Sequence, residues 1–551
     1  MNKEENAFKK ILNLIRLERY EIRAIYSYAV LNGLIQLSLP LGIQGILAFV
    51  LGVTISTSVY ILIGVVILGV LVMGYFQINQ MKLIEIIQQK LFVRYGFAFA
   101  ETIPKLDFKE IDNYYLPEKI NHFFDVINLQ KGISKLLLDI PSALIQIFFG
   151  LIILSLYHPL FFVFAIVLFI ALYVLFKLTI KKGLESSIEE SNYKYKVVAW
   201  LEELGRVIKS IKYSQGTNLN LIKTDEKILN YLYARTTHFN VLLFQFKCLL
   251  YFKVCITAIM LILGSYLLYS QKINVGQFVA AEIIIITVIN SLEKLIKRLE
   301  SVYDVATGIY KLDFVLESNL EKDGKILFTS AKIDIEIKDL DFSYNEAQNV
   351  LNNVAIKIPA SSITCISGEE NSGKSTLLKL LTGSYPDFQG MILLNDIPIQ
   401  NYTFQSLRNI TGVFLNEQEL FDGTVYENIT LGKNDISTEQ IVELSKAIGF
   451  DNFITNFQYG LYENIDPLGK KLPSSLVRKI LILRSLIHNP LLLLLEEPWV
   501  GLEVDTKQKL QQYLIDLSKN KTIVIATNDS NFTMQCSNTI YLSKGNVTAK
   551  K

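Results

Sequence analysis

The sequence predicts a membrane protein with a helical transmembrane domain of six spans, followed by an α/β domain with a mostly parallel sheet. The 551-residue chain is 51% hydrophobic and only 19% charged, whereas soluble proteins usually carry about a quarter charged residues. The long apolar stretches lie before about residue 320, and none of membrane-spanning length follows. Beyond that point strand-like and helix-like segments alternate, which is the pattern of a mostly parallel sheet.

Runs without charged residues locate the six spans. The run from Ala24 to Met81 is 58 residues long, and one bilayer-spanning helix needs about 20. It therefore holds two spans, divided at the polar patch 52–58. The run from Ile140 to Phe176 holds two more, divided at His158 and Pro159. The last two spans are expected at about 249–269 and 273–292.

Basic residues predict the orientation of the spans. Six Lys and Arg residues precede the first span, whereas the loops after the first and third spans have none. Cytoplasmic loops carry the excess of Lys and Arg in membrane proteins. The N-terminal segment 1–23 and the C-terminal domain are therefore expected in the cytoplasm.

Two long polar connections, about 82–135 and 178–245, are expected to continue the spans as helices on the cytoplasmic side. A helix adds about 1.5 Å per residue, so their turns, near 104–112 and 205–215, are places where a soluble domain could hold them. The alternative is that both connections are merely solvated linkers. The predicted domains are residues 1–23, 24–320 and 330–551.

Charge and cysteine content exclude other classes. The net charge of +2 argues against a nucleic-acid partner, which would need a basic excess concentrated in one domain. The four cysteines form no CxxC pair, so neither a zinc site nor a disulfide framework is indicated. They are expected to be small buried residues: Cys248, Cys255, Cys365 and Cys536.

The segment GEENSGKST, which starts at Gly368, predicts a phosphate-binding loop. It follows the strand-like SSITCIS and precedes the helix-like TLLKLLTG. Glycines let successive backbone N–H groups point at phosphate oxygens, Lys374 reaches the β and γ phosphates, and Ser375 ligates Mg²⁺. ATP and Mg²⁺ are therefore the expected cofactors. The candidate nucleotide-binding residues of this loop are Gly368, Asn371, Ser372, Gly373, Lys374, Ser375 and Thr376.

The segment LLLLLEEP supplies the second half of such a site. A buried apolar strand that ends in two carboxylates places Glu496 toward Mg²⁺ and Glu497 toward the water that attacks the γ-phosphate. The alternative is a helix start with acidic residues near its positive dipole end.

Six spans with long cytoplasmic loops, followed by this phosphate-binding domain, resemble a half-size bacterial ABC exporter over nearly the whole chain. The resemblance implies that Tyr344 stacks on adenine and that Glu497 is the catalytic glutamate. It assigns Gly368–Thr376 to the Walker A motif, Leu492–Glu496 to Walker B and 500–503 to the D-loop. Glu496 stands where the family usually has aspartate, so its carboxylate extends one methylene further.

Three other motifs depart from the family pattern. Asn416 stands where the Q-loop glutamine belongs, and Gln418, two residues away, could substitute only with a loop shift. Asn528 replaces the switch histidine. The signature, LSGGQ in the family, is degenerate: Leu472, Pro473, Ser474, Ser475 and Leu476. Proline removes an N–H, and serine lacks the backbone freedom of glycine. ATP binding with weakened hydrolysis is therefore expected, and the alternative is that Glu497 alone sustains turnover.

The resemblance also implies partners, because each ATP in this family lies between one Walker A and the other subunit's signature. A second ABC half-transporter is expected, as a heterodimer rather than a homodimer, in the lipid of a bacterial inner (cell) membrane. The resemblance implies peptide or protein secretion with a periplasmic adaptor protein, and the alternative is a drug or lipid exporter, because these share the architecture. The alternative is a nucleotide-binding but non-hydrolysing regulatory or scaffold partner of another half-transporter.

Polar residues within the spans are the candidates for a substrate pathway. Glu282 lies inside the sixth span, and an intramembrane carboxylate is costly enough to indicate a functional site. The alternative is a protonated glutamate that is hydrogen-bonded between helices. Asn32, Gln36 and Gln44 share one helical face, which is expected to point into the bundle, either along a pathway or as contacts between helices.

Overall fold

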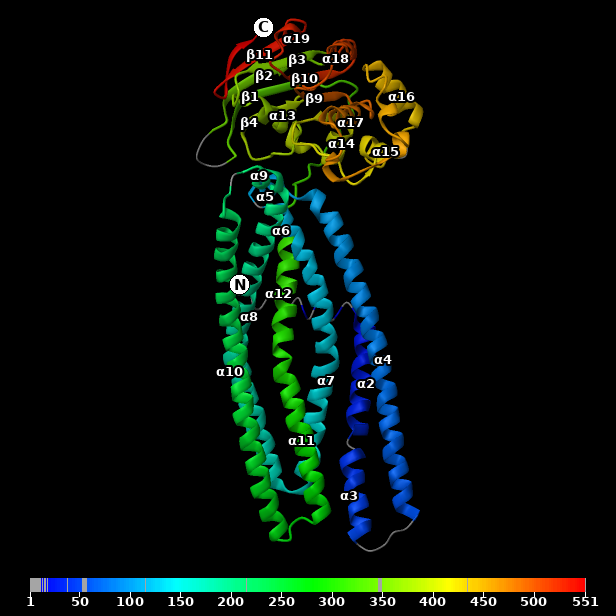
Figure 1. Cartoon of the computed structure of the whole chain (residues 1–551), viewed down its shortest axis with the longest axis vertical. Coiled ribbons are helices and arrows are strands. Elements are labelled where there is room, and N and C mark those ends of the chain that lie inside the picture. The colour runs from blue at the N-terminus through cyan, green and yellow to red at the C-terminus, as the bar shows by residue number, and fades with distance from the viewer. Residues whose placement is uncertain are drawn as a thin grey trace. The chain divides into compact units, whose positions relative to one another are not determined.

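The computed structural model describes two compact units of the chain. It covers residues 11, 13, 16, 18–36, 38–51, 57–113, 115–214, 216–344, 349–433 and 435–550. The helical unit comprises Met1–Lys105 and Tyr114–Ser318, and the sheet unit comprises Leu106–Asn113 and Asn319–Lys551. Figure 1 shows the long helices of the first unit and the mixed α/β structure of the second. Eight residues from within the predicted transmembrane domain thus belong to the sheet unit.

Long helices make up most of the helical unit. Its α-helices are α2 (Arg19–Gln36), α3 (Ser38–Leu51), α4 (Thr57–Thr102), α6 (Leu116–Asn121), α7 (Asp125–Tyr157), α8 (Pro159–Arg206), α9 (Ile208–Tyr213), α10 (Leu219–Tyr269), α11 (Val275–Lys297) and α12 (Leu299–Leu316). Helix α4 begins at Thr57, so the first predicted break is shorter than the patch 52–58, of which residues 52–56 lie outside the described residues.

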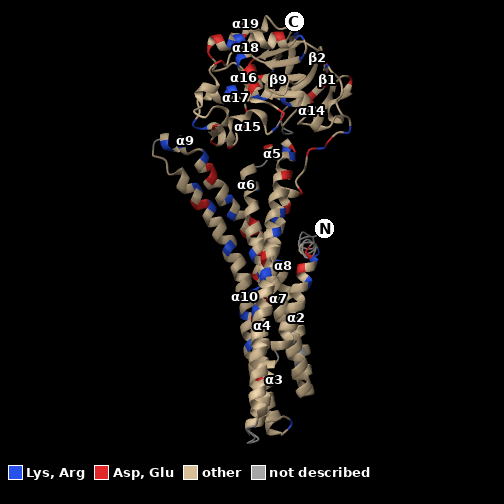
Figure 2. Ribbon diagram, turned by 90° about the vertical axis from the view of Figure 1, so that its right-hand side faces the viewer, with Lys and Arg blue, Asp and Glu red and all other residues tan. Residues whose placement is uncertain are grey.

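In the described part of the chain, five helical stretches are long and apolar enough to cross a membrane. They are Arg19–Val50, Thr57–Lys105, Leu116–Tyr157, Leu219–Tyr269 and Val275–Leu316. The remaining predicted span falls in α8, a helix of 48 residues, some of whose side chains lie outside the described residues, so this span stays a prediction. Figure 2 shows that the Lys, Arg, Asp and Glu residues of the long helices gather toward one end and that few lie at the other end.

Close packing and a few polar contacts hold the helical unit together. Gly183 of α8 lies against the fully buried Tyr303 of α12, where an added Cβ would come within 2.2 Å of the ring. Small residues let helices approach in this way. Between α2 and α7, Gln146 donates a hydrogen bond to Gln36 at 2.5 Å, and Ser291 of α11 donates to Gln146 at 2.6 Å.

The sheet unit contains a six-stranded sheet with the order β12-β11-β3-β10-β9-β6. All its neighbouring strands pair in parallel except β11 and β12, which confirms the predicted mostly parallel sheet. Its strands are β3 (Ile363–Gly368), β6 (Thr411–Phe414), β9 (Leu492–Glu496), β10 (Thr522–Ala526), β11 (Asn538–Ser543) and β12 (Asn546–Lys550).

A second, antiparallel sheet has the order β2-β1-β4-β5. Its strands are β1 (Ile335–Phe342), β2 (Leu351–Ile358), β4 (Gln389–Leu394) and β5 (Ile397–Pro398), and a short pair is formed by β7 (Gly423–Thr424) and β8 (Asn464–Ile465). The sheet unit's α-helices are α5 (Phe108–Asn113), α13 (Lys374–Leu381), α14 (Phe404–Ile410), α15 (Val425–Thr430), α16 (Thr438–Ala447), α17 (Ser474–Leu486), α18 (Val504–Leu517) and α19 (Ser530–Thr533).

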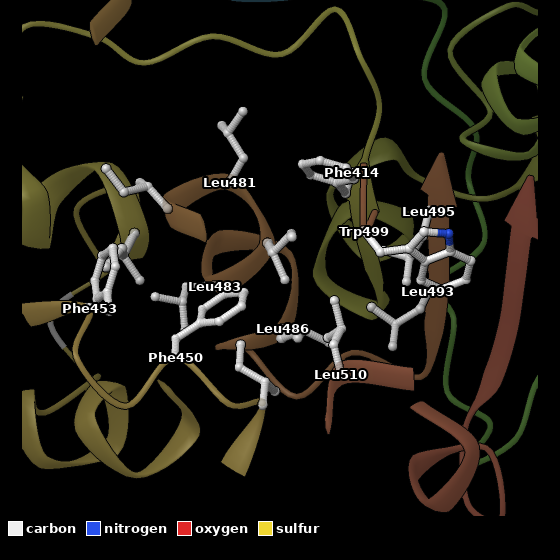
Figure 3. Close-up of a cluster of buried hydrophobic side chains, with 14 of the residues drawn as sticks. Phe414, Phe450, Phe453, Leu481, Leu483, Leu486, Leu493, Leu495, Trp499 and Leu510 are labelled. Atoms are coloured by element: carbon white, nitrogen blue, oxygen red, sulfur yellow. The ribbon is translucent and has the colours of Figure 1, made fainter. Parts of the chain in front are cut away.

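Buried apolar residues fix the parallel sheet against its helices. Every side chain of β10 and the first four of β9 are buried, as expected for parallel strands covered on both faces. Figure 3 shows Trp499 beside Leu493 and Leu495 of β9, within the same core cluster as Leu483 of α17. This core positions the carboxyl ends of β3, β9 and β10.

The expectation for the cysteines is partly wrong. Cys365 of β3 is fully buried, but it is joined in a disulfide to Cys536, which follows α19. Cys255 is exposed on α10, and Cys248 is half-buried. The two disulfide partners are 171 residues apart in the sequence, and their proximity is created by the parallel pairing of β3 with β11.

Candidate functional site

The loop between β3 and α13 has the backbone of a phosphate cradle. Gly368 has φ +152° and Gly373 has φ +99°, and residues with a Cβ rarely adopt these backbone conformations. A Cβ on Gly368 would meet the Leu542 carbonyl oxygen at 2.0 Å. Asn371 also has a positive φ, of 61°. Helix α13 begins at Lys374, so its free N–H groups open toward this loop.

Lys374 spans the loop from the first turn of α13. Its Nζ donates hydrogen bonds to the carbonyl oxygens of Gly368 and Glu369, both at 2.7 Å. Burial lowers the pKa of Lys374, while nearby carboxylates, including Glu497, act in the opposite direction. Because phosphate oxygens are stronger acceptors than neutral carbonyl oxygens, the ammonium group can exchange these hydrogen bonds for bonds to a phosphate.

Ser375 and Glu496 meet where a metal ion would be expected. The Ser375 hydroxyl donates to Glu496 Oε1, and the backbone N–H of Asn416 donates to Glu496 Oε2 at 3.1 Å. Glu496 ends β9, so the alternative of a helix start is wrong. Hydroxyl and carboxylate oxygens suit Mg²⁺, which proteins bind through one or two carboxylates plus substrate phosphates. These residues therefore fit the expected ion.

Glu497 is held on the end of β10. Its φ of +42° is unusual for a residue other than glycine and is typical of functional sites. Its carboxylate accepts from the Asn528 N–H at 2.8 Å and from the Thr527 hydroxyl at 3.0 Å. Asn528 in turn accepts from the Gly368 N–H at 3.2 Å. The switch position thus joins the candidate catalytic carboxylate to the phosphate loop.

Arg478 is a site residue that the sequence interpretation missed. It lies one turn into α17, and its guanidinium donates to the Glu497 carbonyl oxygen at 2.9 Å and to Asn416 Oδ1 at 3.0 Å. Burial lowers its pKa, although the carboxylates of Glu497 and Glu496 oppose this effect. The available signal was a basic residue four positions after Ser474 in the degenerate signature.

The five signature residues occupy the start of α17. Pro473 is the N-cap residue and makes no side-chain capping hydrogen bond. Leu476 is 9% exposed and belongs to the core cluster, against which Leu472 also packs. Ser474 begins the helix, next to Ser475. Within the described residues, the hydrogen bonds from α17 to the phosphate-loop network start from Arg478.

Tyr344 presents part of its ring beside a cavity. The ring packs edge-on against Phe342 and Tyr385, and its hydroxyl donates to Thr376 Oγ1 at 3.3 Å. The side chain is 37% exposed and lines a cavity of about 690 Å³ with residues of α5, among them Asp112. An aromatic face at such a cavity suits a purine base. Ser372 of the loop is buried.

The polar residues of the spans divide into two kinds. Gln36 and Gln44 accept hydrogen bonds from α7 side chains, Gln146 and Tyr157 respectively, so they act as contacts between helices. Asn32 Oδ1 is a buried oxygen without a hydrogen-bond partner among the described residues. Glu282 of α11 is half-buried, and its carboxylate approaches α10 at Gly264.

Comparison with known proteins supports this assignment of the sheet unit. Residues 351–500 match the ABC transporter family, and this stretch contains the phosphate loop, Asn416, the signature and Glu497.

Two curated bacterial relatives illustrate the sequence similarity. Over 276 residues, 49% of this chain and 45% of the relative, the chain is 29% identical to the uncharacterized ABC transporter ATP-binding protein YknV of Bacillus subtilis (strain 168). Over 272 residues, 49% of this chain and 38% of the relative, it is 29% identical to the alpha-hemolysin translocation ATP-binding protein HlyB of Escherichia coli O157:H7. The chain thus matches less than half the length of these relatives.

The fold extends the similarity to the helical unit. A solved structure described as a bacterial Atm1-family ABC exporter with ATP bound matches with a TM-score of 0.86 over 97% of this chain and 95% of that chain. The sequence identity is 18%, so this likeness concerns the fold. The chain therefore has an ABC exporter fold, with helices that precede an α/β ATP-binding domain.

Proposed function

We propose that this chain, an ABC transporter ATP-binding domain fused to a transmembrane domain, is a subunit of a dimeric ATP-driven exporter that moves a substrate out of the cytoplasm. The observation that carries the proposal is the convergence of Lys374, Ser375, Glu496 and Glu497 on one end of the parallel sheet. Binding clefts of open α/β sheets lie at the carboxyl ends of their strands.

Each residue has a role in the proposed site. The N–H groups of the loop and Lys374 bind the phosphates, and Tyr344 stacks on the adenine. Ser375 and Glu496 hold Mg²⁺, which when bound neutralises charge on the β and γ phosphates. Glu497 orients the attacking water and accepts its proton. Its two oxygens each accept one hydrogen bond, from the Asn528 N–H and the Thr527 hydroxyl, and each keeps a further lone pair that can accept from water.

We infer that ATP binding is intact and hydrolysis is weak. Pro473 lacks the N–H and the hydroxyl of the family's serine, and the two serines that replace glycines restrict the approach of the backbone to a partner's γ-phosphate. Asn528 can donate a hydrogen bond but cannot carry a proton charge at neutral pH. Transition-state contacts of this kind are each worth about 10²-fold to 10³-fold in rate.

A heterodimer with a second ABC half-transporter is the favoured assembly. In a homodimer both sites would use the degenerate signature, whereas a partner could supply a complete one to Lys374 and Glu497. The HlyB relative is named for alpha-hemolysin translocation, which favours peptide or protein secretion with an adaptor protein. We place the chain in a bacterial inner (cell) membrane, with its ATP-binding domain cytoplasmic and Glu282 on the substrate pathway.

A regulatory role is the alternative, in which the chain binds nucleotide without hydrolysis and gates another half-transporter. The missing glutamine at Asn416 and the missing histidine at Asn528 favour it, because a partner's signature would not repair them. ATPase activity of the purified chain, alone and with a co-expressed partner, separates the two roles.

Substitution Lys374→Ala tests the nucleotide site. Nucleotide that binds only the folded protein stabilises it by about 2.7 kcal/mol at 100 times its dissociation constant. We expect Mg·ATP to raise the melting temperature of the wild-type chain in detergent and to leave that of the variant unchanged. Lys519→Ala is the control, because Lys519 is 70% exposed and pairs with Asp516 at the surface. If Mg·ATP raised the melting temperatures of Lys374→Ala and Lys519→Ala equally, the assignment of Lys374 to the nucleotide site would be wrong.

A further inference from the structure

Arg478 connects three separate segments of the sheet unit. Its own helix, α17, supplies the guanidinium, the segment after β6 supplies Asn416 Oδ1, and the residue after β9 supplies the Glu497 carbonyl oxygen. The two acceptors are 81 positions apart in the sequence. A planar guanidinium can bridge two acceptors in fixed directions, which a lysine ammonium on a flexible stem cannot do as well.

The connection continues from Asn416 to the metal end of the site. The backbone N–H of Asn416 donates to Glu496 Oε2 at 3.1 Å, and the other carboxylate oxygen of Glu496 accepts from the Ser375 hydroxyl. Arg478 therefore holds the side chain of Asn416, and the backbone N–H of Asn416 orients the Glu496 carboxylate. The segment that carries Asn416 is otherwise a surface turn, in which Asn416 and Glu417 are exposed.

We propose that Arg478 is a positioning residue for Mg²⁺: it fixes the Asn416 segment against the end of β9 so that Glu496 and Ser375 face the same ion. The inference rests on the proposed ATP site and adds a partner outside the nucleotide motifs. In this arrangement Asn416 contributes its backbone N–H to Glu496 and its side-chain oxygen to Arg478. The asparagine is thus committed to the protein rather than to the ion.

Magnesium titrations test this role apart from activity. Outer-shell partners of metal ligands typically change metal affinity by 10-fold to 100-fold when they are removed. We expect Arg478→Ala to raise the Mg²⁺ concentration for half-maximal thermal protection by about tenfold, at fixed non-hydrolysable ATP analogue. Protection by the analogue in EDTA should equal that of the wild type. Arg478→Lys should behave like the alanine variant, because the charge alone does not bridge both acceptors.

Two further variants provide a control and test whether Arg478 acts through Asn416. Lys479→Ala removes a neighbouring cation of the same helix, whose Nζ lies 5.4 Å from the centroid of the Phe450 ring, and it should leave the Mg²⁺ titration unchanged. Asn416→Ala should weaken Mg²⁺ protection, and the double variant with Arg478→Ala should be no weaker than Arg478→Ala alone. Such non-additivity is expected when two groups act through one contact.

The outcomes separate this inference from the proposed function. If the wild-type chain gains no protection from nucleotide, the ATP site itself fails. If the wild type is protected and Arg478→Ala has the same Mg²⁺ dependence, the positioning role is wrong. The role is also wrong if Arg478→Ala loses protection equally with and without Mg²⁺, since that result indicates general packing on Phe414, whose ring centroid lies 5.6 Å from Arg478 Cζ.

Discussion

Gly183 shows how one hydrogen in place of a methyl group sets the distance between two helices. It faces Tyr303, whose hydroxyl accepts a hydrogen bond from Gln245 at 2.7 Å. That bond and the complete burial of Tyr303 leave the ring no free direction in which to move. The contact is therefore unable to adapt to a larger residue on α8.

We predict that Gly183→Ala lowers the unfolding free energy of the helical unit by about 1–3 kcal/mol, because overpacking forces neighbouring atoms apart. The matched control is Gly205→Ala in the same helix, where an added Cβ meets nothing within 4 Å, and alanine is the better helix former. Thermal unfolding in detergent compares the two. Equal melting temperatures of the two variants would show that α8 and α12 move apart without a loss of stability.

At the same scale, the sequence predicted contiguous site residues and missed one that depends on tertiary structure. Lys374 and Ser375 were identifiable because a local run of residues fixes the loop backbone. Arg478 was not, because its role depends on Asn416 and Glu497 being brought together by the pairing of β6 with β9. The contact between Cys365 and Cys536 was hidden for the same reason. Such relations arise from strand order, which spacing does not reveal.

Among the elements, α17 begins with residues that suit the start of a helix but are poor at binding phosphate. Pro473 suits a helix start because its fixed φ is compatible with one, but it cannot cap with a side chain. A serine at the N-cap would add a hydrogen bond worth about 1 kcal/mol. Leu476, however, is buried in the core, so a complete LSGGQ would place a polar glutamine there.

We therefore predict that the triple variant Pro473→Ser, Ser474→Gly, Ser475→Gly, which keeps Leu476, raises the ATPase rate of the assembled transporter about tenfold or more. Adding Asn528→His should raise it further. Steady-state ATPase assays in lipid measure both effects. Because the repaired signature serves the ATP bound by the partner subunit, the gain from the triple variant should survive Glu497→Gln in this chain, whereas Glu497→Gln should abolish the gain from Asn528→His. The degenerate signature is not limiting if the triple variant hydrolyses ATP no faster than the unmodified transporter.

For the whole molecule, apolar length predicted the long helices and charge predicted their orientation. The polar breaks fell where helices end because a bilayer leaves few places for a turn. The polar character of Gln36 and Gln44 did not reveal whether they line a path or join helices. Only the position of Gln146 and Tyr157 on α7 decides that.

Orientation can be tested with cysteines introduced into a background in which Cys248 and Cys255 are serine. Because Lys and Arg flank the cytoplasmic side, we predict that a membrane-impermeant thiol reagent labels Thr57→Cys from outside the cell. It should label Ser214→Cys only after the membrane is opened. Thr57 and Ser214 are both exposed, so access is set by the membrane. If Ser214→Cys were labelled from outside and Thr57→Cys were not, the predicted orientation would be wrong.

The eight residues Leu106–Asn113 are grouped with the sheet unit. Within it, Phe108 packs on Tyr385 with ring centroids 5.3 Å apart, and Asp112 accepts a hydrogen bond from the Tyr385 hydroxyl at 2.9 Å. Neither unit is therefore encoded by one uninterrupted stretch of the gene. A fragment that begins at Asn319 would leave behind a piece of its own structure. Any exchange of ATP-binding domains between relatives would need two joined exchanges, one of them inside the membrane-domain sequence.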